Sequence, residues 1–223
     1  MRGKFALNYD EYRQKVVQPL FNWMKNCDSL VVLVDVTSVL SSGLGMYQGN
    51  RELLTSLIQQ LNPGRSYFGV SLDLLTTLLS PIHGPLNKLL DLNWHEISRV
   101  AFVATKADLV HQSDRLNMGD LLREMTQGLV AAHKEKAAKL AVRYFSCAAV
   151  NSTRSTDSGK LQGMHPVERN IVEYEPSRAP KTWPEIWQAG EFCFPWVAPA
   201  ISARRDLPPK HIGLNLIADF LMR

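Results

Sequence analysis

Three runs of apolar, largely β-branched residues alternate along the chain with segments of helical periodicity. The runs cover residues 29–36, 99–104 and 142–147. A continuous apolar run fits a strand that is covered on both faces, as in a parallel sheet. Strand, helix, strand, helix, strand is the alternation of an α/β fold. We therefore expect a doubly wound parallel sheet, whose ligands bind beyond the carboxyl ends of the strands.

The segments between the runs carry apolar residues at three- and four-residue spacing, which is typical of helices. A first helix is predicted from Asn8, where Glu11 completes a capping box, with a bend at Pro19. After the first strand comes a Ser/Gly-rich segment over residues 41–49, and then a helix capped by Asn50 is predicted. Further helices are predicted over residues 118–140 and 212–222.

Two segments interrupt or follow this alternation. Residues 62–98 form a leucine-rich helical insertion, which is either packed core or a partner-binding hairpin. Eight of the twelve prolines and three tryptophans lie after residue 160, which favours an ordered, loop-rich covering segment over a flexible linker. We call residues 161–211 the strap. We expect one unit over residues 1–160 and, packed on it, a second over 161–223 that joins the strap to the last helix.

Composition narrows the function classes. A net charge of +4 and a pI near 9.0 are too mild for a dedicated nucleic-acid binder. Three separated cysteines support neither disulfides nor a zinc cluster, and the six histidines show no metal-ligand spacing. No apolar run is long enough to span a membrane, and the first residues are not a secretory signal. We expect a cytoplasmic protein with no metal site and no transmembrane segment. The basic stretch over residues 133–139 is either a solvated helix face or a contact with anionic lipid or protein.

Thr105-Lys106-Ala107-Asp108, directly after the second strand, matches the [NT]KxD motif with which GTPases hold guanine. An Asp carboxylate accepts two hydrogen bonds, and guanine offers two adjacent donors at N1 and N2. Adenine presents an acceptor at N1 and would leave the carboxylate unpaired, which supports discrimination. The alternative is a polar turn that caps the next helix.

Two further strand ends carry polar or small residues. Ser146-Cys147-Ala148 resembles the second base loop of GTPases, whose backbone amide meets guanine O6, although Cys147 stands where Ala is usual. Taken individually, Ser146 and Cys147 could also be small buried residues. Asp35 ends the first strand and is either a structural cap or a residue that faces the nucleotide.

The parts that act on phosphate are missing from this sequence. It contains no G-x-x-x-x-G-K-[ST], and Gly43, Gly45 and Gly49 are not followed by Lys-Ser/Thr. It also lacks a D-x-x-G after an early strand. Phosphoryl transfer needs a phosphate-binding turn, a metal site and an element that positions water. We therefore predict no catalytic residue in this chain and expect it to be inactive alone.

Four segments together resemble the YcjX-like family of stress-associated P-loop NTPases: Phe5-Ala-Leu-Asn-Tyr, Ser29 to Asp35, Val103 to Asp108, and His211-Ile-Gly-Leu. The resemblance runs from Phe5 to Arg223 and corresponds to the second half of that family's proteins, which carry a Walker A segment and a switch-like motif upstream. It implies a partial P-loop NTPase-like sheet. It also implies that Thr105, Lys106 and Asp108 recognise the base, with Ser146, Cys147 and Ala148 as the second base loop.

The resemblance further implies GTP or GDP as ligand, with ATP as an alternative, and Mg²⁺ only when the missing N-terminal half is supplied in cis or in trans. The chain is then a gene fragment or one half of a split protein. A membrane-protein partner, and attachment to the inner membrane, are also implied. Two other hypotheses remain: a non-catalytic interaction module that has lost the phosphate site, and an unrelated α/β enzyme that uses Asp35 and Asp108 as acid and base.

Overall fold

The three predicted strands form one parallel sheet. The computed structural model describes residues 8–61 with short gaps, 97–134, 140–200 and 208–222. The strands are β1 (Ser29–Val34), β2 (Arg99–Ala104) and β3 (Ala141–Ser146), hydrogen-bonded in the order β1-β2-β3. Both pairs are parallel and in register, so that Val34, Ala104 and Ser146 end side by side. The predicted α/β class and parallel sheet are confirmed.

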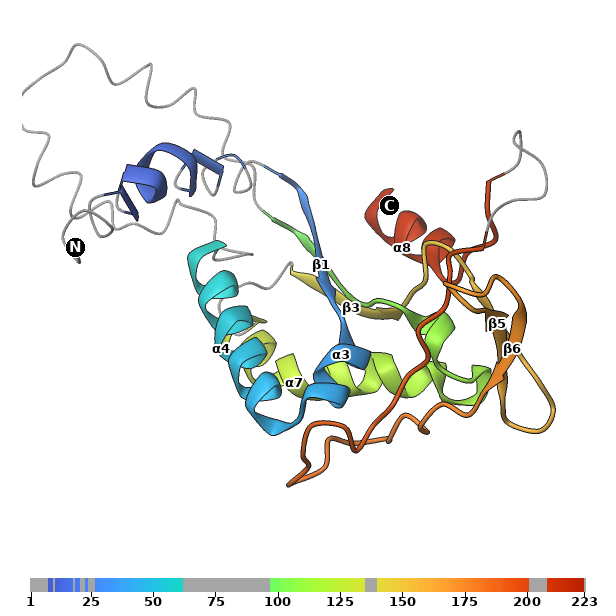
Figure 1. Ribbon diagram of the computed structural model, residues 1–223. Coiled ribbons are helices and arrows are strands. Elements are labelled where there is room, and N and C mark those ends of the chain that lie inside the picture. Colours follow the sequence, from blue (N-terminus) through green and yellow to red (C-terminus); the bar gives the residue numbers. More distant parts are fainter. Residues whose placement is uncertain are drawn as a thin grey trace, which may run out of the picture.

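One face of the sheet is covered by three helices, α3 (Val36–Ser42), α4 (Leu44–Leu61) and α7 (Arg115–Lys134) (Figure 1). Phe102 points from the central strand into this layer and is 1% exposed. From α7, four side chains pack against it at helical spacing: Met118, Leu121, Leu122 and Met125. The main core therefore lies between this face and α7, as the periodicity of α7 predicts.

The predicted helix cap at Asn50 is wrong, because residues 41–49 are already helical on both sides of Gly43. Asp35 is the N-cap of α3, and Gly43, at φ +85°, separates α3 from α4. A side chain at position 43 would meet the backbone of Ala189 at 2.8 Å. Asn50 lies inside α4 and donates to the carbonyl of Met46 at 2.9 Å. The glycines inside α4 lower the stability of the helix only modestly. The Ser/Gly-rich pattern of the sequence suggests a larger cost.

The opposite face of the sheet is covered only in part. Helix α8 (Leu214–Met222) places Ile217 and Phe220 against Ala101 and Val103 of β2. In β1, however, the side chains on this face are exposed, Val31 at 40% and Leu33 at 66%. The expectation that the first strand is buried on both faces is therefore wrong. The described residues provide a helix over β2 and β3 on this side and none over β1.

The rest of the chain forms a small antiparallel sheet and then crosses the helical layer (Figure 1). The small sheet contains β4 (Thr153–Ser155), β5 (Leu161–Met164) and β6 (Ile171–Tyr174), in that order. The predicted boundary at 160/161 falls between β4 and β5, and the two-unit division stays a prediction.

Two tryptophans fix the strap to the helices. Trp187 donates from Nε1 to the carbonyl of Leu40 at 3.0 Å, and Trp183 does the same to Leu121 at 2.7 Å. Tyr47 of α4 contacts both indole rings, at centroid distances of 4.7 Å to Trp183 and 5.8 Å to Trp187. A buried indole usually needs such a partner for its N–H, and both have one here.

Parts of some predicted segments lie outside the described residues. The leucine-rich insertion is undescribed over residues 62–96, and the basic stretch over 135–139. Near the N-terminus, short helical stretches include the π-helix η1 (Arg13–Val17). Four of the apolar side chains whose spacing predicted this helix are exposed: Tyr12, Val16, Leu20 and Trp23.

Candidate functional site

The carboxyl ends of the three parallel strands bring most of the predicted site residues to one edge. Thr105 follows β2 and donates its amide to the carbonyl of Val34 in β1 at 2.9 Å. On the other side, Cys147 donates its amide to Ala104 at 2.8 Å. The amide of Ala107 in turn donates to the carbonyl of Cys147 at 3.0 Å. The turn after β2 is thus held by both neighbouring strand ends.

Lys106 has an unusual backbone and a charged partner. Its φ of 59° and ψ of 33° place it in the left-handed region, directly before the short 3₁₀ turn η3 (Ala107–Leu109). Its ammonium lies 2.6 Å from Oδ2 of Asp35. A non-glycine residue in this conformation persists only when its surroundings hold it there, and such residues cluster at functional sites. The Asp35 ion pair and the Ala107–Cys147 bond are two of those restraints.

Asp35 is the N-cap of α3, which is one of the two roles that the sequence left open, and it also pairs with Lys106. Its carboxylate accepts from the Ser38 amide at 3.0 Å, from Ser38 Oγ at 2.7 Å and from Thr37 Oγ1 at 2.6 Å. Burial raises the pKa of this carboxyl, but the bonds from Lys106, Thr37 and Ser38 outweigh burial and leave the pKa below its usual value. Asp35 is therefore ionised at neutral pH.

Asp108 is buried, with 6% of its surface exposed. Its Oδ2 accepts the amide of Ser152 at 3.1 Å, and its backbone carbonyl accepts the hydroxyl of Thr153. No hydrogen bond to Oδ1 is found among the described residues. The segment after β3 therefore orients one carboxylate oxygen and leaves the other available to accept a hydrogen bond.

Arg115, at the start of α7, is a site residue that the sequence analysis missed. Its Nε donates to the carbonyl of Ala107 at 3.1 Å, inside the motif itself. Burial lowers the pKa of Arg115, while the charge of Asp108 opposes that shift. Burial is the main cause that raises the pKa of the Cys147 thiol, and the charge of Asp108 raises it further. This thiol is therefore protonated at neutral pH. No sequence motif marks Arg115 or Ser152.

The predicted second base loop is held differently from the motif residues. Ser146 Oγ donates to the carbonyl of Arg115 at 2.6 Å, which connects β3 to α7. The amide of Ala148 donates to Ile212 at 3.0 Å, in a two-residue bridge with the segment before α8. Since Cys147 already bonds to Ala104, the amides of both Cys147 and Ala148 are used within the protein. The next two amides, those of Ala149 and Val150, have no partner among the described residues.

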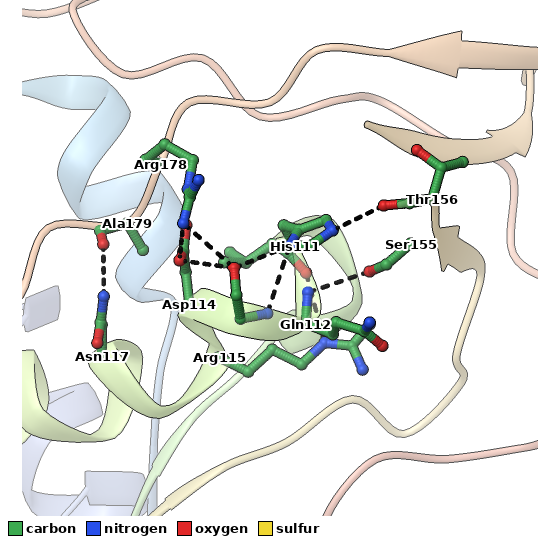
Figure 2. Close-up of polar contacts among 11 residues, drawn as sticks. His111, Gln112, Asp114, Arg115, Asn117, Ser155, Thr156, Arg178 and Ala179 are labelled. Carbon is green, nitrogen blue, oxygen red and sulfur yellow. Dashed lines mark hydrogen bonds and ion pairs between the residues drawn. The ribbon is translucent and has the colours of Figure 1, made fainter. Parts of the chain in front are cut away.

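A polar network behind the site connects the turn after β2 to the strap and the small sheet (Figure 2). Arg178 of the strap forms a bidentate ion pair with Asp114, and this bond is the main cause that holds the pKa of Asp114 below its usual value. His111 lies 3.1 Å from the carbonyl of Thr156. Asn117 donates to the carbonyl of Ala179 at 2.7 Å. These contacts fix the start of α7, from which Arg115 reaches the motif.

Within the part of the chain that the structure describes, no group of three or more His, Cys, Asp or Glu side chains could hold a metal ion. Over the same residues, no helix combines the length and apolar character needed to cross a membrane.

The sequence pattern of the YcjX-like family, DUF463, matches residues 1–223, which is the whole chain. The chain belongs to the YcjX-like family. The resemblance inferred from four short segments is thereby confirmed.

A curated relative of this YcjX-like chain is a protein of Escherichia coli (strain K12) named Ras-like GTPase YcjX. The two sequences are 26% identical over 233 residues, an alignment that covers 99% of this chain and 44% of the relative. The chain thus spans less than half the length of the curated relative that it matches.

Proposed function

We propose that this chain is the base-recognising part of a GTP-binding P-loop protein and that Asp108 selects guanine. The observation that carries the proposal is the placement of Asp108: it is buried at the carboxyl end of the central parallel strand, with one oxygen oriented by Ser152. Ligands of parallel α/β sheets bind at this end of the strands. The name of the Escherichia coli relative, a Ras-like GTPase, supports the same class of ligand.

The chemistry of the site favours guanine over adenine, and ATP remains the alternative nucleotide. The free oxygen of Asp108 accepts from the donors at N1 and N2 of guanine, whereas adenine would leave a buried carboxylate facing a lone pair. The ion pair with Asp35 holds Lys106 in position. In this proposal the four-carbon stem of Lys106 lies beside the base. Thr105 holds the motif against β1. A carbonyl at guanine O6 needs a backbone donor, and in the loop after β3 the amides of Ala149 and Val150 are the ones that bond to no described residue.

Hydrolysis requires a second segment that carries the phosphate loop and the Mg²⁺ ligands. The present sequence has no Walker A motif, and the chain matches 44% of its relative's length. We infer that such a segment, in cis or in trans, completes a doubly wound P-loop sheet. The expected membrane-protein partner is independent of this inference and stays a prediction.

The exposed side of β1 is the surface that this segment would cover. Among the described residues β1 is one of the two outer strands of the sheet, and Val31 and Leu33 are exposed on the face that α8 leaves open. An edge strand offers a row of backbone donors and acceptors to a further strand. A parallel strand beside β1, followed by a helix over Val31 and Leu33, satisfies both the backbone and the apolar side chains.

The test is a titration of the 223-residue chain with fluorescent GDP, ADP and xanthosine diphosphate. We expect GDP to bind more tightly than ADP. Asp108→Asn replaces an acceptor by a donor, which matches the carbonyl that xanthine carries at C2 in place of the amine. This variant should therefore move the preference from guanine to xanthine by about tenfold or more.

Asp157→Asn is the matched control, because Asp157 is exposed in the turn between β4 and β5. It removes the same charge and should leave the GDP affinity unchanged. An unchanged base preference in Asp108→Asn, with the fold intact by circular dichroism, would show that Asp108 does not recognise the base.

A non-catalytic interaction module is the second candidate, and one observation favours it. The amides of Cys147 and Ala148, which the motif predicts as base contacts, already bond to Ala104 and Ile212. A folded chain that binds none of the three nucleotides, alone or with a segment carrying the phosphate loop, would support this candidate.

A further inference from the structure

The outer edge of β3 lies at the base of a groove, on the side of the sheet away from β1. The groove has a volume of about 1030 Å³ and runs between α7 and α8. One wall is formed by α7, with Val130 and Ala131, and the other by α8, with Leu216 and Phe220. Its floor is formed by β3 residues 142–145, so the groove is separate from the motif at the carboxyl ends of the strands.

The floor of this groove carries backbone groups that bond to none of the described residues. Ala141 and Cys147 donate their amides to the β2 side, to Ser98 and Ala104. Because alternate residues of a strand direct their backbone groups to opposite sides, those of Val142 and Tyr144 point away from β2. No described residue bonds to them. Farther along, Gly213 lies against the carbonyl of Ser146, so the free part of the edge is short.

The charged side chains of the groove are mainly basic. Arg99, Arg123 and Arg143 line it, against the single carboxylate of Asp219. Arg123 is paired with Asp120 at 3.1 Å and lies over the Tyr144 ring. Arg143 lies over the ring of Phe220 at 5.3 Å, and neither it nor Arg99 forms an ion pair with any described residue. Two guanidinium groups are therefore available to a carboxylate.

From these observations we propose that the groove binds an extended acidic peptide segment of another protein, which adds to β3 as a fourth strand. The backbone of the segment pairs with Val142 and Tyr144. Its alternate side chains contact the α7 wall and the α8 wall, and its carboxylates bond to Arg99 and Arg143. Regularly spaced backbone donors and acceptors match a peptide strand, which is the reason to prefer a peptide over a polyanion that charge alone would attract. This site is distinct from the proposed base site and does not depend on it.

The probe is a fluorescein-labelled decapeptide of alternating Val and Glu, titrated into the 223-residue chain by fluorescence anisotropy. A Val-Lys version tests the role of charge. Two N-methylated versions, one methylated on every Val and one on every Glu, test backbone pairing. A strand uses the amides of only one alternating set to pair with its neighbour. We therefore expect one methylated peptide to lose binding and the other to keep it, and the Val-Lys peptide not to bind.

The protein variant is Arg99→Glu with Arg143→Glu, which should weaken binding of the Val-Glu peptide by at least about tenfold. Arg154→Glu is the matched control, since Arg154 is exposed on β4, away from the groove. A thermal melt by circular dichroism checks that both variants fold, and unchanged GDP binding would place the effect outside the base site.

Four results would each overturn the proposal. They are the absence of binding by the Val-Glu peptide, equal binding by the Val-Lys peptide, equal behaviour of the two methylated peptides, and full binding by the Arg99→Glu, Arg143→Glu variant. Tighter binding of a short oligothymidylate than of the acidic peptide would also overturn it, because the groove would then be a polyanion site.

Discussion

The two faces of the parallel sheet are built from the same three strands but differ in how they are covered. On one face, α3, α4 and α7 cover all three strands, and the strap adds two tryptophans whose N–H groups bond to the helices. On the other face, α8 covers Ala101 and Val103, and the side chains of β1 stay exposed. Val32 and Leu33 are neighbours in sequence and similar in chemistry, yet they are 6% and 66% exposed.

This difference shows that hydrophobic composition does not determine which positions the fold uses for stability. A strand that is apolar on both faces needs a cover on both. Within the described residues, one apolar face of β1 has no such cover. We therefore expect stability to be concentrated on the first face and association on the second. The first two predictions below change one face and use a matched change on the other face or on the surface as the control, and the third changes the ion pair at the end of β1.

The largest difference is expected between two lysine substitutions in β1. Val32→Lys places an unpaired charge in the main core and should destabilise the chain by on the order of 5 kcal/mol, enough to unfold it. Leu33→Lys, one residue away, should change the free energy of unfolding by less than about 1 kcal/mol. Denaturant unfolding measures both.

The same pair separates stability from association. Leu33→Lys should reduce any self-association of the chain in sedimentation experiments, because it places charge on the exposed β1 face. Similar unfolding free energies for the two variants would contradict the difference between the faces.

The next effect concerns the strap. Trp187→Ala removes an indole that is 3% exposed and leaves the Leu40 carbonyl without its donor, which should cost about 3–5 kcal/mol. Trp196→Ala, at a position 73% exposed, should change the free energy of unfolding by less than about 0.5 kcal/mol. Thermal unfolding of the two variants should therefore differ by many degrees. If both tryptophans contribute equally, the strap does not stabilise the helical face.

The smallest effect is a dependence on pH. The folded-state pKa of Asp35 lies below its reference value of 3.8, so its charge stabilises the fold above that pH. This stabilisation is lost as the pH falls through the lower folded pKa. Asp35→Asn keeps a good N-cap for α3 and removes the ion pair with Lys106. Because Lys106 is 52% exposed, the loss at pH 7 should be only about 0.5–1 kcal/mol.

The measurement for Asp35→Asn is the free energy of unfolding between pH 2 and pH 7. The wild-type and variant curves should converge toward the acid end, where Asp35 is protonated in both states. A constant difference across the whole range would mean that the ion pair does not contribute.

The sequence predicted the strands well because their pattern is local. Each apolar run becomes a strand within two residues of its predicted bounds, and the motif residues meet because parallel strands end together. The α3–α4 pair could not be predicted in the same way. Its cause is the Asp35 cap and a close approach between Gly43 and Ala189, a contact between segments far apart in the chain.

The residues of the candidate site also fall into two groups, those that a local pattern predicts and those that it does not. Thr105, Lys106 and Asp108 follow from a four-residue motif, and their placement after a strand was predictable. Arg115, Ser152 and Ile212 reach the site only through tertiary contacts, so no local pattern marks them. β1 was expected to be covered on both faces, and this expectation was wrong for a related reason. An apolar run does not encode which segment packs against it.

The bridge between Ala148 and Ile212 has a consequence for the order of folding. Ala148 belongs to the loop after β3. Its partner, Ile212, follows the small sheet and the strap in the sequence. Contacts between distant segments form after local ones, because a long loop must close first. The local helix α7 should therefore form early in refolding, whereas the loop beside Asp108 should be ordered late, as should the pairing of β1 with β2, whose residues are also far apart in the sequence.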